Sequence, residues 1–135
     1  MKQILAVIGV LALAIGVALA QQTSTAQQLT ITNGPGVDNL SANSAEVFWN
    51  TNQNSGSVVL YGTSRDMLTE SAEVPGDVTN HKVQIDKLQP DTTYFFQVIS
   101  AQTDADADEA KSDIGIFKTP SASQAQNEAN PDEGK

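Results

Sequence analysis

The feature that most constrains the fold of this chain is a leucine, a proline–aspartate turn and a tyrosine in close succession. The run LQPDTTY spans residues 88–94 and leads directly into the apolar stretch 95–98. Leu88 ends one strand, Pro90 and Asp91 reverse the chain, and Tyr94 opens the next strand with its ring turned inward. The tyrosine hydroxyl then bonds a backbone group a few residues upstream, as in the tyrosine corner of β-sandwiches. The run therefore predicts an all-β sandwich.

Alternating apolar residues, separated by turn residues, predict seven short strands. We expect strands near residues 29–32, 45–50, 57–62, 68–73, 82–87, 93–101 and 114–119. Turn-forming residues cluster between them, at 33–36, 52–56, 75–77 and 104–109. This spacing predicts two antiparallel sheets, in which the first, second and fifth strands face the other four.

The two-residue period of the strands also predicts which side chains form the core. Trp49 is the largest of them and should be its centre. The residues that we expect to define the structure are Trp49, Tyr61, Leu88, Pro90, Tyr94 and Phe117. The other side chains expected to face inward are Leu29, Ile31, Val37, Leu40, Ala45, Val47, Val59, Val83, Ile85, Phe96 and Val98.

Four groups of residues have a combined spacing that is specific, although each group alone is weak. They are Trp49/Thr51, Val59/Tyr61/Gly62, His81/Val83/Ile85/Leu88/Pro90/Thr92/Tyr94 and Phe117/Thr119/Pro120. Over residues 28–120 the chain resembles a fibronectin type III domain, notably the variety found in bacteria and ahead of the catalytic domain of purple acid phosphatases. The resemblance implies a seven-stranded, immunoglobulin-like sandwich with a binding or scaffolding role. In phosphatases the metal ligands belong to the separate catalytic domain, so we expect no phosphatase activity here.

The two ends of the chain differ from the domain in composition. Residues 1–20 combine Lys2, an apolar stretch and an Ala-x-Ala site ending at Ala20, which predicts a secretory signal peptide. The alternative is an uncleaved membrane anchor. Residues 21–27 are a polar lead-in, and residues 121–135 contain no large apolar side chain, which predicts a disordered acidic tail. We expect a secreted or periplasmic protein that meets a membrane only if the first segment is not cleaved.

Composition excludes several classes of function. The chain has no cysteine, so thiolate metal sites, thiol catalysis, disulfides and lipid attachment to cysteine are excluded. Its formal net charge is −9, and no basic stripe interrupts the acidic surface. Such a surface repels nucleic acid and anionic lipid headgroups, so we expect no nucleic-acid partner.

Few residues are candidates for chemistry. His81 is the only histidine, and the resemblance implies that it makes a hydrogen bond that shapes the sandwich edge. The acidic loop from Asp104 to Glu109 invites a calcium interpretation, but it lacks the glycine and glutamate that an EF-hand loop requires, which favours a solvated loop. The chain has no G-x-S-x-G elbow and no phosphate-binding loop. We therefore expect no catalytic residue, no cofactor, no metal and no enzyme activity.

One outer sheet face is predicted to be unusually apolar. Its expected residues are Val58, Leu60, Phe95, Ile99, Ile114 and Ile116. The other outer face is expected to be polar, with Phe48 as its one apolar residue. Contiguous apolar patches mark interaction surfaces, so the six residues are a candidate partner surface. The alternatives are a bulge that shifts the register, or a cover formed by the lead-in or the 68–73 segment.

These observations support two hypotheses for function. The first is a non-enzymatic exported module that binds a protein or a cell-surface glycan. The second is an accessory subunit of an extracytoplasmic enzyme or surface assembly. A protein partner is favoured over a glycan, because no tryptophan or tyrosine falls in an expected loop. The oligomeric state, the identity of the partner and the biological process stay open.

Overall fold

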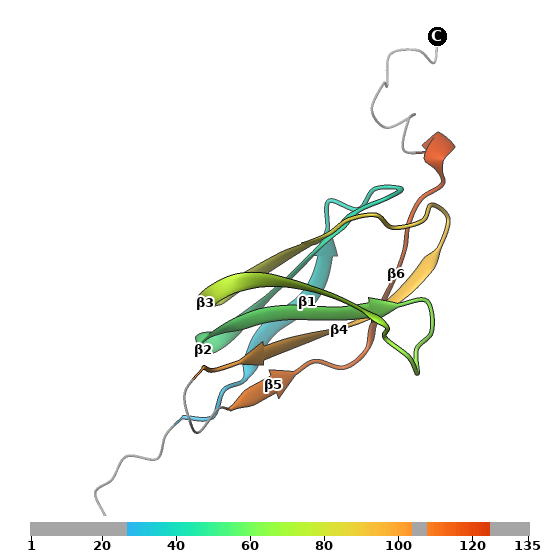
Figure 1. Ribbon diagram of the computed structural model, residues 1–135. Helices are drawn as coiled ribbons and strands as arrows, with labels where there is room; N and C mark the ends of the chain where they lie inside the picture. Colours follow the sequence, from blue (N-terminus) through green and yellow to red (C-terminus); the bar gives the residue numbers. More distant parts are fainter. Residues whose placement is uncertain (1–26, 104–107, 125–135) are drawn as a thin grey trace, which may run out of the picture.

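The computed structural model describes residues 27–103 and 108–124, which form a nearly all-β fold (Figure 1). Its strands are β1 (Ile31–Asp38), β2 (Ala45–Gly62), β3 (Glu70–Ile85), β4 (Thr93–Ala101), β5 (Glu109–Lys111) and β6 (Gly115–Lys118). All pairings are antiparallel: β2 pairs with β1, β3 and β4, and β4 pairs with β5 and β6. β2 is therefore the strand on which the whole fold is assembled.

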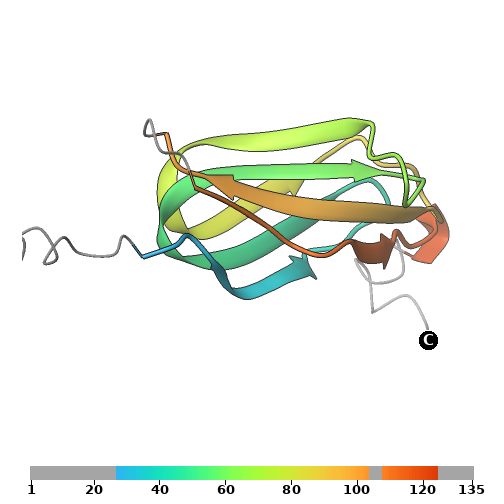
Figure 2. The same cartoon turned by 90° about the horizontal axis from the view of Figure 1, so that it is seen from below.

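Two long strands bend and pass from one layer of the sandwich into the other (Figure 2). One layer contains β1, residues 45–50 of β2 and residues 80–85 of β3; we call it the β1 layer. The other contains residues 70–74 of β3, residues 57–62 of β2, and β4, β5 and β6; we call it the β4 layer. Strands that change sheets make the corners of such sandwiches. The all-β, two-layer sandwich predicted from the sequence is thereby confirmed.

The predicted strands correspond to parts of the observed ones, but six continuous strands replace seven. The second and third expected strands are the two halves of β2, the fourth and fifth lie in β3, and the seventh corresponds to β6, while β5 was not expected. The expected turns at 52–56 and 75–77 are bends within β2 and β3, where the register shifts between Asn50 and Ser57. The expected turn at 33–36 lies inside β1 as an irregularity that includes a cis Gly34–Pro35 bond.

The core fills the space between the two layers. Its buried cluster contains Ala45, Val47, Trp49, Val59, Val83, Ile85, Leu88, Tyr94, Phe96, Val98 and Phe117, with Ile31, Val37, Tyr61 and Ala72 partly buried against it. Leu29 is buried as well. Two expectations were wrong: Leu40 is exposed, and Pro90 is exposed in the corner turn. A turn residue outside both sheets has no opposing layer to pack against, so Pro90 restricts the backbone and does not fill the core.

The tyrosine corner is present. The backbone N–H of Gln89 donates a hydrogen bond of 2.9 Å to the hydroxyl oxygen of Tyr94, which confirms the bond predicted from the sequence. The Tyr94 ring stacks on Phe117 with centroids 5.5 Å apart. Asp91 adopts a positive φ of 50° in the turn. The corner therefore ties the end of β3 to the start of β4 and to β6.

Several predictions concern residues that lie outside the described part of the chain. These are the signal peptide at 1–20, the lead-in up to residue 26, residues 104–107 of the acidic loop, and the tail from residue 125. Within residues 27–103 and 108–124, no helix has the length and hydropathy needed to cross a membrane.

Candidate partner-binding surface

The outer side of the β4 layer is built from alternate residues of β2 and β4. Val58 pairs with Ile99, and Gly62 pairs with Phe95. Paired residues in an antiparallel sheet project from the same face. The structure therefore brings four of the six candidates together on one side: Val58, Leu60, Phe95 and Ile99 are all half-buried there, while their neighbours in sequence point into the core.

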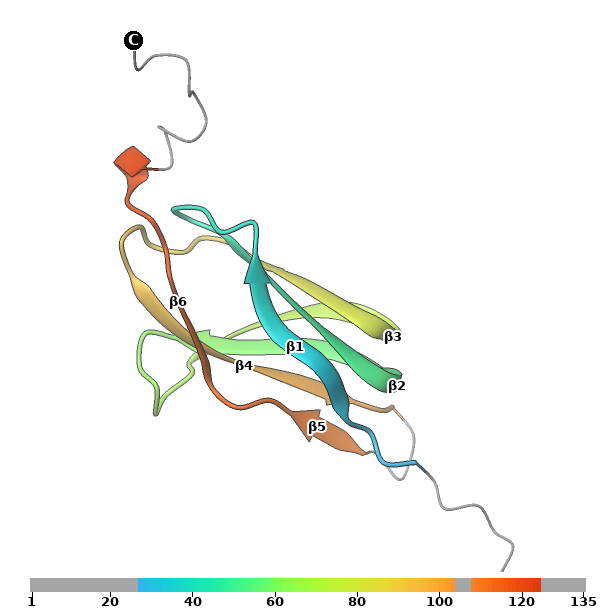
Figure 3. The ribbon, with the colours of Figure 1, turned by 180° about the vertical axis from the view of Figure 1, so that it is seen from behind.

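The two candidates from the last strand are placed differently. Ile116 pairs with Phe95 and is 63% exposed, so it extends the face. Ile114 lies between β5 and β6, where the register against β4 shifts by one residue. It lines a hollow together with Ile31 and Pro35 of β1, which lies beside this break (Figure 3). We name Val58, Leu60, Phe95, Ile99 and Ile116 the outer apolar face, and Ile114 lies at its edge.

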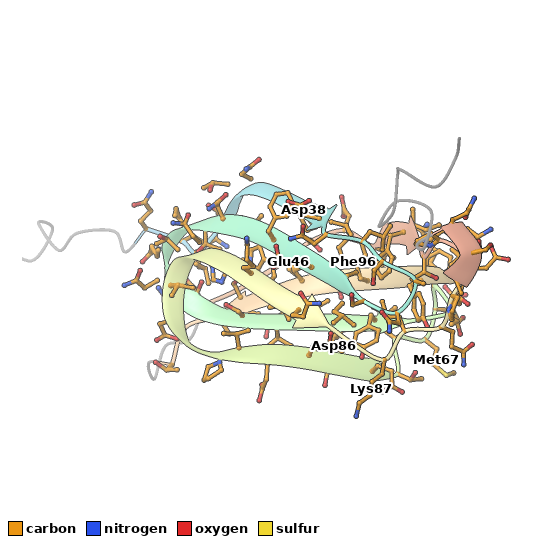
Figure 4. The ribbon with its side chains drawn as sticks, turned by 90° about the horizontal axis from the view of Figure 1, so that it is seen from above. Asp38, Glu46, Met67, Asp86, Lys87 and Phe96 are labelled. Carbon is orange, nitrogen blue, oxygen red and sulfur yellow. The ribbon has the colours of Figure 1, made fainter. Side chains whose placement is uncertain are left out.

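Sequence reasoning missed one apolar neighbour of this face. Met67 is 65% exposed in the turn that follows β2 (Figure 4). Its carbonyl oxygen lies close over Gly62, where an added Cβ would be 2.9 Å away. Because Gly62 pairs with Phe95, the turn that carries Met67 lies at this end of the face. An apolar side chain in the otherwise polar turn at 63–67 was the available signal.

The outer apolar face has an uncharged centre and charged margins. Glu73 of β3 pairs with Val58, and Lys111 of β5 pairs with Ile99, so Glu73, Val58, Ile99 and Lys111 form one row across four strands. Gln97 lies in the next row, opposite Leu60, and its amide nitrogen donates a 2.7 Å hydrogen bond to the Ser112 carbonyl. An apolar centre with a polar rim is the usual anatomy of a protein interface.

The opposite outer face, on the β1 layer, is polar. The Nδ2 of Asn33 donates to Oδ1 of Asn50 at 3.3 Å, and Asn50 in turn donates to Asn80, so three amides form a chain across three strands. Lys82 and Glu46 form an ion pair at 3.1 Å. Figure 4 shows Glu46 and Asp38 on this side of the molecule. The predicted contrast between the two outer faces is present in the structure.

A hollow of about 310 Å³ lies on this polar face. It is lined by Asp38, Phe48, Trp49, Asn50, Asn80, His81 and Lys82. The tip of the Phe48 ring lies over Gly36, where an added Cβ would be 2.5 Å from the ring. The glycine therefore lets the ring lie across β1 and form one wall of the hollow.

His81 belongs to a buried polar cluster inside the sandwich, where β2 bends. Its ring is only 2% exposed and lies parallel to Trp49, with centroids 4.8 Å apart. Its Nε2 lies 2.8 Å from the Thr51 hydroxyl, and its Nδ1 lies 2.7 Å from the Ser57 hydroxyl. Trp49 donates its indole N–H to the hydroxyl of Ser100 at 2.8 Å. These bonds bear out the structural role predicted for His81.

The hydrogen bonds of the cluster favour one tautomer of the imidazole. The Thr51 hydroxyl donates to the Gln53 carbonyl at 2.8 Å, so its oxygen is left to accept from Nε2–H of His81. The Ser57 hydroxyl then donates to Nδ1. Burial lowers the pKa of His81, because the cationic ring would lose its hydration. Within residues 27–103 and 108–124, no group of three or more histidine, aspartate or glutamate side chains is arranged to hold a metal ion.

The two carboxylates in the described part of the acidic loop, Asp108 and Glu109, each contact another residue. Asp108 accepts a long hydrogen bond of 3.4 Å from the Leu29 amide, and Glu109 pairs with Lys111 at 2.7 Å. Its other carboxylates, Asp104 and Asp106, lie outside the described residues. The two described carboxylates thus contact Leu29 and Lys111.

Comparisons with known proteins agree with this architecture. The family model described as "Purple acid Phosphatase, N-terminal domain" matches residues 28–119. Among solved structures, one titled "Myokine structure" is 21% identical with a TM-score of 0.53, covering 71% of this chain and 99% of that chain. The fibronectin type III domain of human contactin 1 is 21% identical with a TM-score of 0.50, covering 74% of this chain and 83% of that chain. The type III domain from the human KIAA0970 protein is 19% identical with a TM-score of 0.50, covering 68% of this chain and 74% of that chain. No curated protein sequence matches the chain.

Proposed function

The chain belongs to the family of purple acid phosphatase N-terminal domains, and from this premise we propose that it is a non-enzymatic, exported module that binds a protein partner. The observation that carries the proposal is the outer apolar face. Ile116, which pairs with Phe95, and Met67, whose carbonyl oxygen lies close to Gly62, are each more than 60% exposed. Covering such a surface removes apolar area from water, which lowers the free energy and so favours association.

The chemistry of His81 supports a non-enzymatic role. It is the only histidine of the chain, and both of its ring nitrogens are bonded to buried hydroxyl groups. A general base must reach the proton that it abstracts from a substrate, and a ring that is 2% exposed does not reach one. The family's name refers to the domain that precedes a phosphatase, and we assign no phosphatase activity to this chain.

Export is part of the same proposal and rests on residues 1–20. Their apolar stretch and Ala-x-Ala site predict cleavage after Ala20. A sandwich that folds without cysteine does not depend on disulfide formation in the compartment that it reaches.

Affinity capture tests the proposal. The tagged mature protein and its Leu60→Glu variant are each used to capture proteins from the extracytoplasmic fraction of the source cell, and the captured proteins are identified by mass spectrometry. We expect at least one protein to be captured by the parent and lost with Leu60→Glu. Thr32→Glu is the matched control, because Thr32 is exposed on β1 of the other layer. A set of captured proteins that is the same for all three baits would contradict the proposal.

The alternative is an accessory subunit of an extracytoplasmic enzyme or a surface assembly. It uses the same outer apolar face, so the identity of the captured protein separates the two functions. An accessory subunit should co-purify in fixed stoichiometry with a hydrolase or a fibre protein, and its removal should lower the activity or assembly of that protein.

The hollow beside Phe48 favours a second candidate, the binding of a glycan. An aromatic ring next to amide, carboxylate and ammonium groups offers both stacking and hydrogen bonds to a sugar ring. Titration with soluble cello-, xylo- and chito-oligosaccharides tests this candidate. We expect binding that is lost with Phe48→Ala and weakened by Gly36→Ala, which displaces the ring. Leu60→Glu should leave this binding unchanged, and the candidate fails if none of the sugars binds.

A further inference from the structure

We propose that the partner on the outer apolar face is a second copy of this chain, related by a two-fold axis that runs along the strands between β2 and β4. This inference rests on the proposed function and names the partner of the same face. A two-fold interface uses one surface twice, so every contact between two different residues occurs in two copies.

The row that crosses four strands makes the face complementary to itself. Its order is Glu73 on β3, Val58 on β2, Ile99 on β4 and Lys111 on β5. An axis along the strands, placed midway between β2 and β4, reverses this order in the second copy. Glu73 then faces Lys111 of the second copy, and Val58 faces Ile99 of the second copy. Two opposite-charge pairs and two apolar pairs result from one row.

The next rows fit the same operation. Leu60 faces Gln97 of the second copy, whose amide is already bonded to the Ser112 carbonyl and so presents its methylene groups. Phe95 faces the Gly62 end of β2 in the second copy, where Met67 is exposed. Methionine sulfur packs well against aromatic rings, so this end gains two sulfur–aromatic contacts.

The distribution of charge permits association despite a formal net charge of −9. The centre of the face carries no charge, and Lys111 lies on its margin. Asp38 and Glu46 lie on the other layer (Figure 4), about 10 Å of packed core away from this face. At physiological ionic strength, screening over about 8 Å weakens repulsion between such distant charges.

The size of the face sets the expected strength of the contact. Four strands and about five residues along each strand cover roughly 19 Å by 17 Å. The footprint is thus roughly 320 Å² per copy and about 650 Å² in total, which is below the size of stable interfaces and in the range of weak, transient ones, so we expect a dissociation constant on the order of tens of micromolar or weaker. Lys111 is also paired with Glu109 of its own chain, but that pair is largely exposed, so it competes only weakly.

A charge exchange tests the proposal. Sedimentation equilibrium of the mature chain, from about 5 to about 500 µM, should show a monomer–dimer equilibrium for the parent. Glu73→Lys alone and Lys111→Glu alone should each weaken dimerisation at least about tenfold, because like charges then meet across the axis. The double variant Glu73→Lys/Lys111→Glu restores opposite charges and should restore the dimer. Thr32→Glu should leave it unchanged.

Three outcomes would overturn the second copy as the partner: a monomer at every concentration, a dimer whose dissociation constant is unchanged by Leu60→Glu, or a double variant that dimerises no more tightly than the single variants. Thermal unfolding of each variant by circular dichroism shows whether it is folded. The proposed function is judged separately by capture. A monomeric parent that still captures a different protein in a Leu60-dependent way leaves the proposed function standing and removes only this inference.

Discussion

The Trp49–His81 stack is the residue-scale feature on which the interior depends. The indole is 1% exposed, lies parallel to the imidazole and donates to Ser100 across the two layers. Truncating Trp49 to alanine removes the largest buried side chain, its stack on His81 and the hydrogen bond that it donates to the buried hydroxyl of Ser100. Such a change costs about 3–5 kcal/mol of unfolding free energy, a large part of the stability of a domain of this size.

Urea denaturation followed by circular dichroism measures this prediction. Trp49→Ala should be unfolded or strongly destabilised. Trp49→Phe is the control, because it keeps an aromatic ring in the core and loses the bond to Ser100 and only part of the buried ring volume, so its loss of unfolding free energy should be smaller. An alanine variant with the unfolding midpoint of the parent would show that the indole does not hold the layers together.

The buried imidazole of His81 predicts a dependence of stability on pH. Burial lowers its pKa below the ordinary value of 6.5, so the unfolded chain binds a proton at a higher pH than the folded chain does. This contribution to stability is complete above the unfolded pKa and falls as the pH drops below it. We expect the unfolding free energy to decrease from neutral pH toward pH 5, more steeply in the parent than in His81→Gln. Parallel pH profiles for the two proteins would contradict the prediction.

At the scale of elements, Gly36 and Gly115 each lie under an aromatic ring of the neighbouring strand. In the core, Gly115 of β6 pairs with Phe96 of β4, and a Cβ on it would be 2.5 Å from the ring. Gly115→Ala should therefore displace Phe96 and cost about 1–3 kcal/mol through overpacking. Gly56→Ala is the matched control, because its Cβ would meet only the Ala101 carbonyl at 3.4 Å. If Gly115→Ala and Gly56→Ala had equal unfolding midpoints in thermal denaturation, the Phe96 ring would be shown to move aside without cost.

The sequence predicted those elements whose cause is local. Alternation with a period of two residues placed both halves of β2 and β4, and therefore four residues of the outer apolar face, on the correct side. The corner at Leu88 to Tyr94 was predicted because its bond spans only five residues. Burial followed from the same alternation, except at Leu40 and Pro90, which lie in turns.

The features that the sequence did not predict depend on contacts between distant segments. Residues 52–56 contain turn-forming residues, yet they bend within a paired strand, because Thr51 and Ser57 bond His81 of β3. The displacement of Ile114 to the edge depends on a register shift against β4. The place of Met67 at the Gly62 end of β2 depends on how the turn after β2 folds back over Gly62. The first two have no signal in the local pattern of residues, whereas the third has only the apolar side chain in the otherwise polar turn at 63–67.

At the scale of the whole molecule, the two outer faces are distinct: one is apolar with charged margins, and the other carries an amide chain, an ion pair and a hollow. A module that binds through its outer apolar face has to reach the compartment that contains its partner. This requirement is consistent with the export proposed from residues 1–20. The intact mass of the protein from the extracytoplasmic fraction should correspond to a chain that begins at Gln21. A mass that includes residues 1–20 would contradict cleavage and favour an anchor.

The account rests centrally on the outer apolar face as the surface of association. A dilution series of amide NMR spectra tests it most directly, because each backbone group reports separately. We predict concentration-dependent shifts confined to residues 57–62, 67, 73, 95–99, 111 and 116, with residues 33, 50 and 80 of the opposite face unchanged. Spectra that do not change with concentration would contradict the second copy as the partner, and shifts that map to the polar face would contradict the outer apolar face as the surface of association.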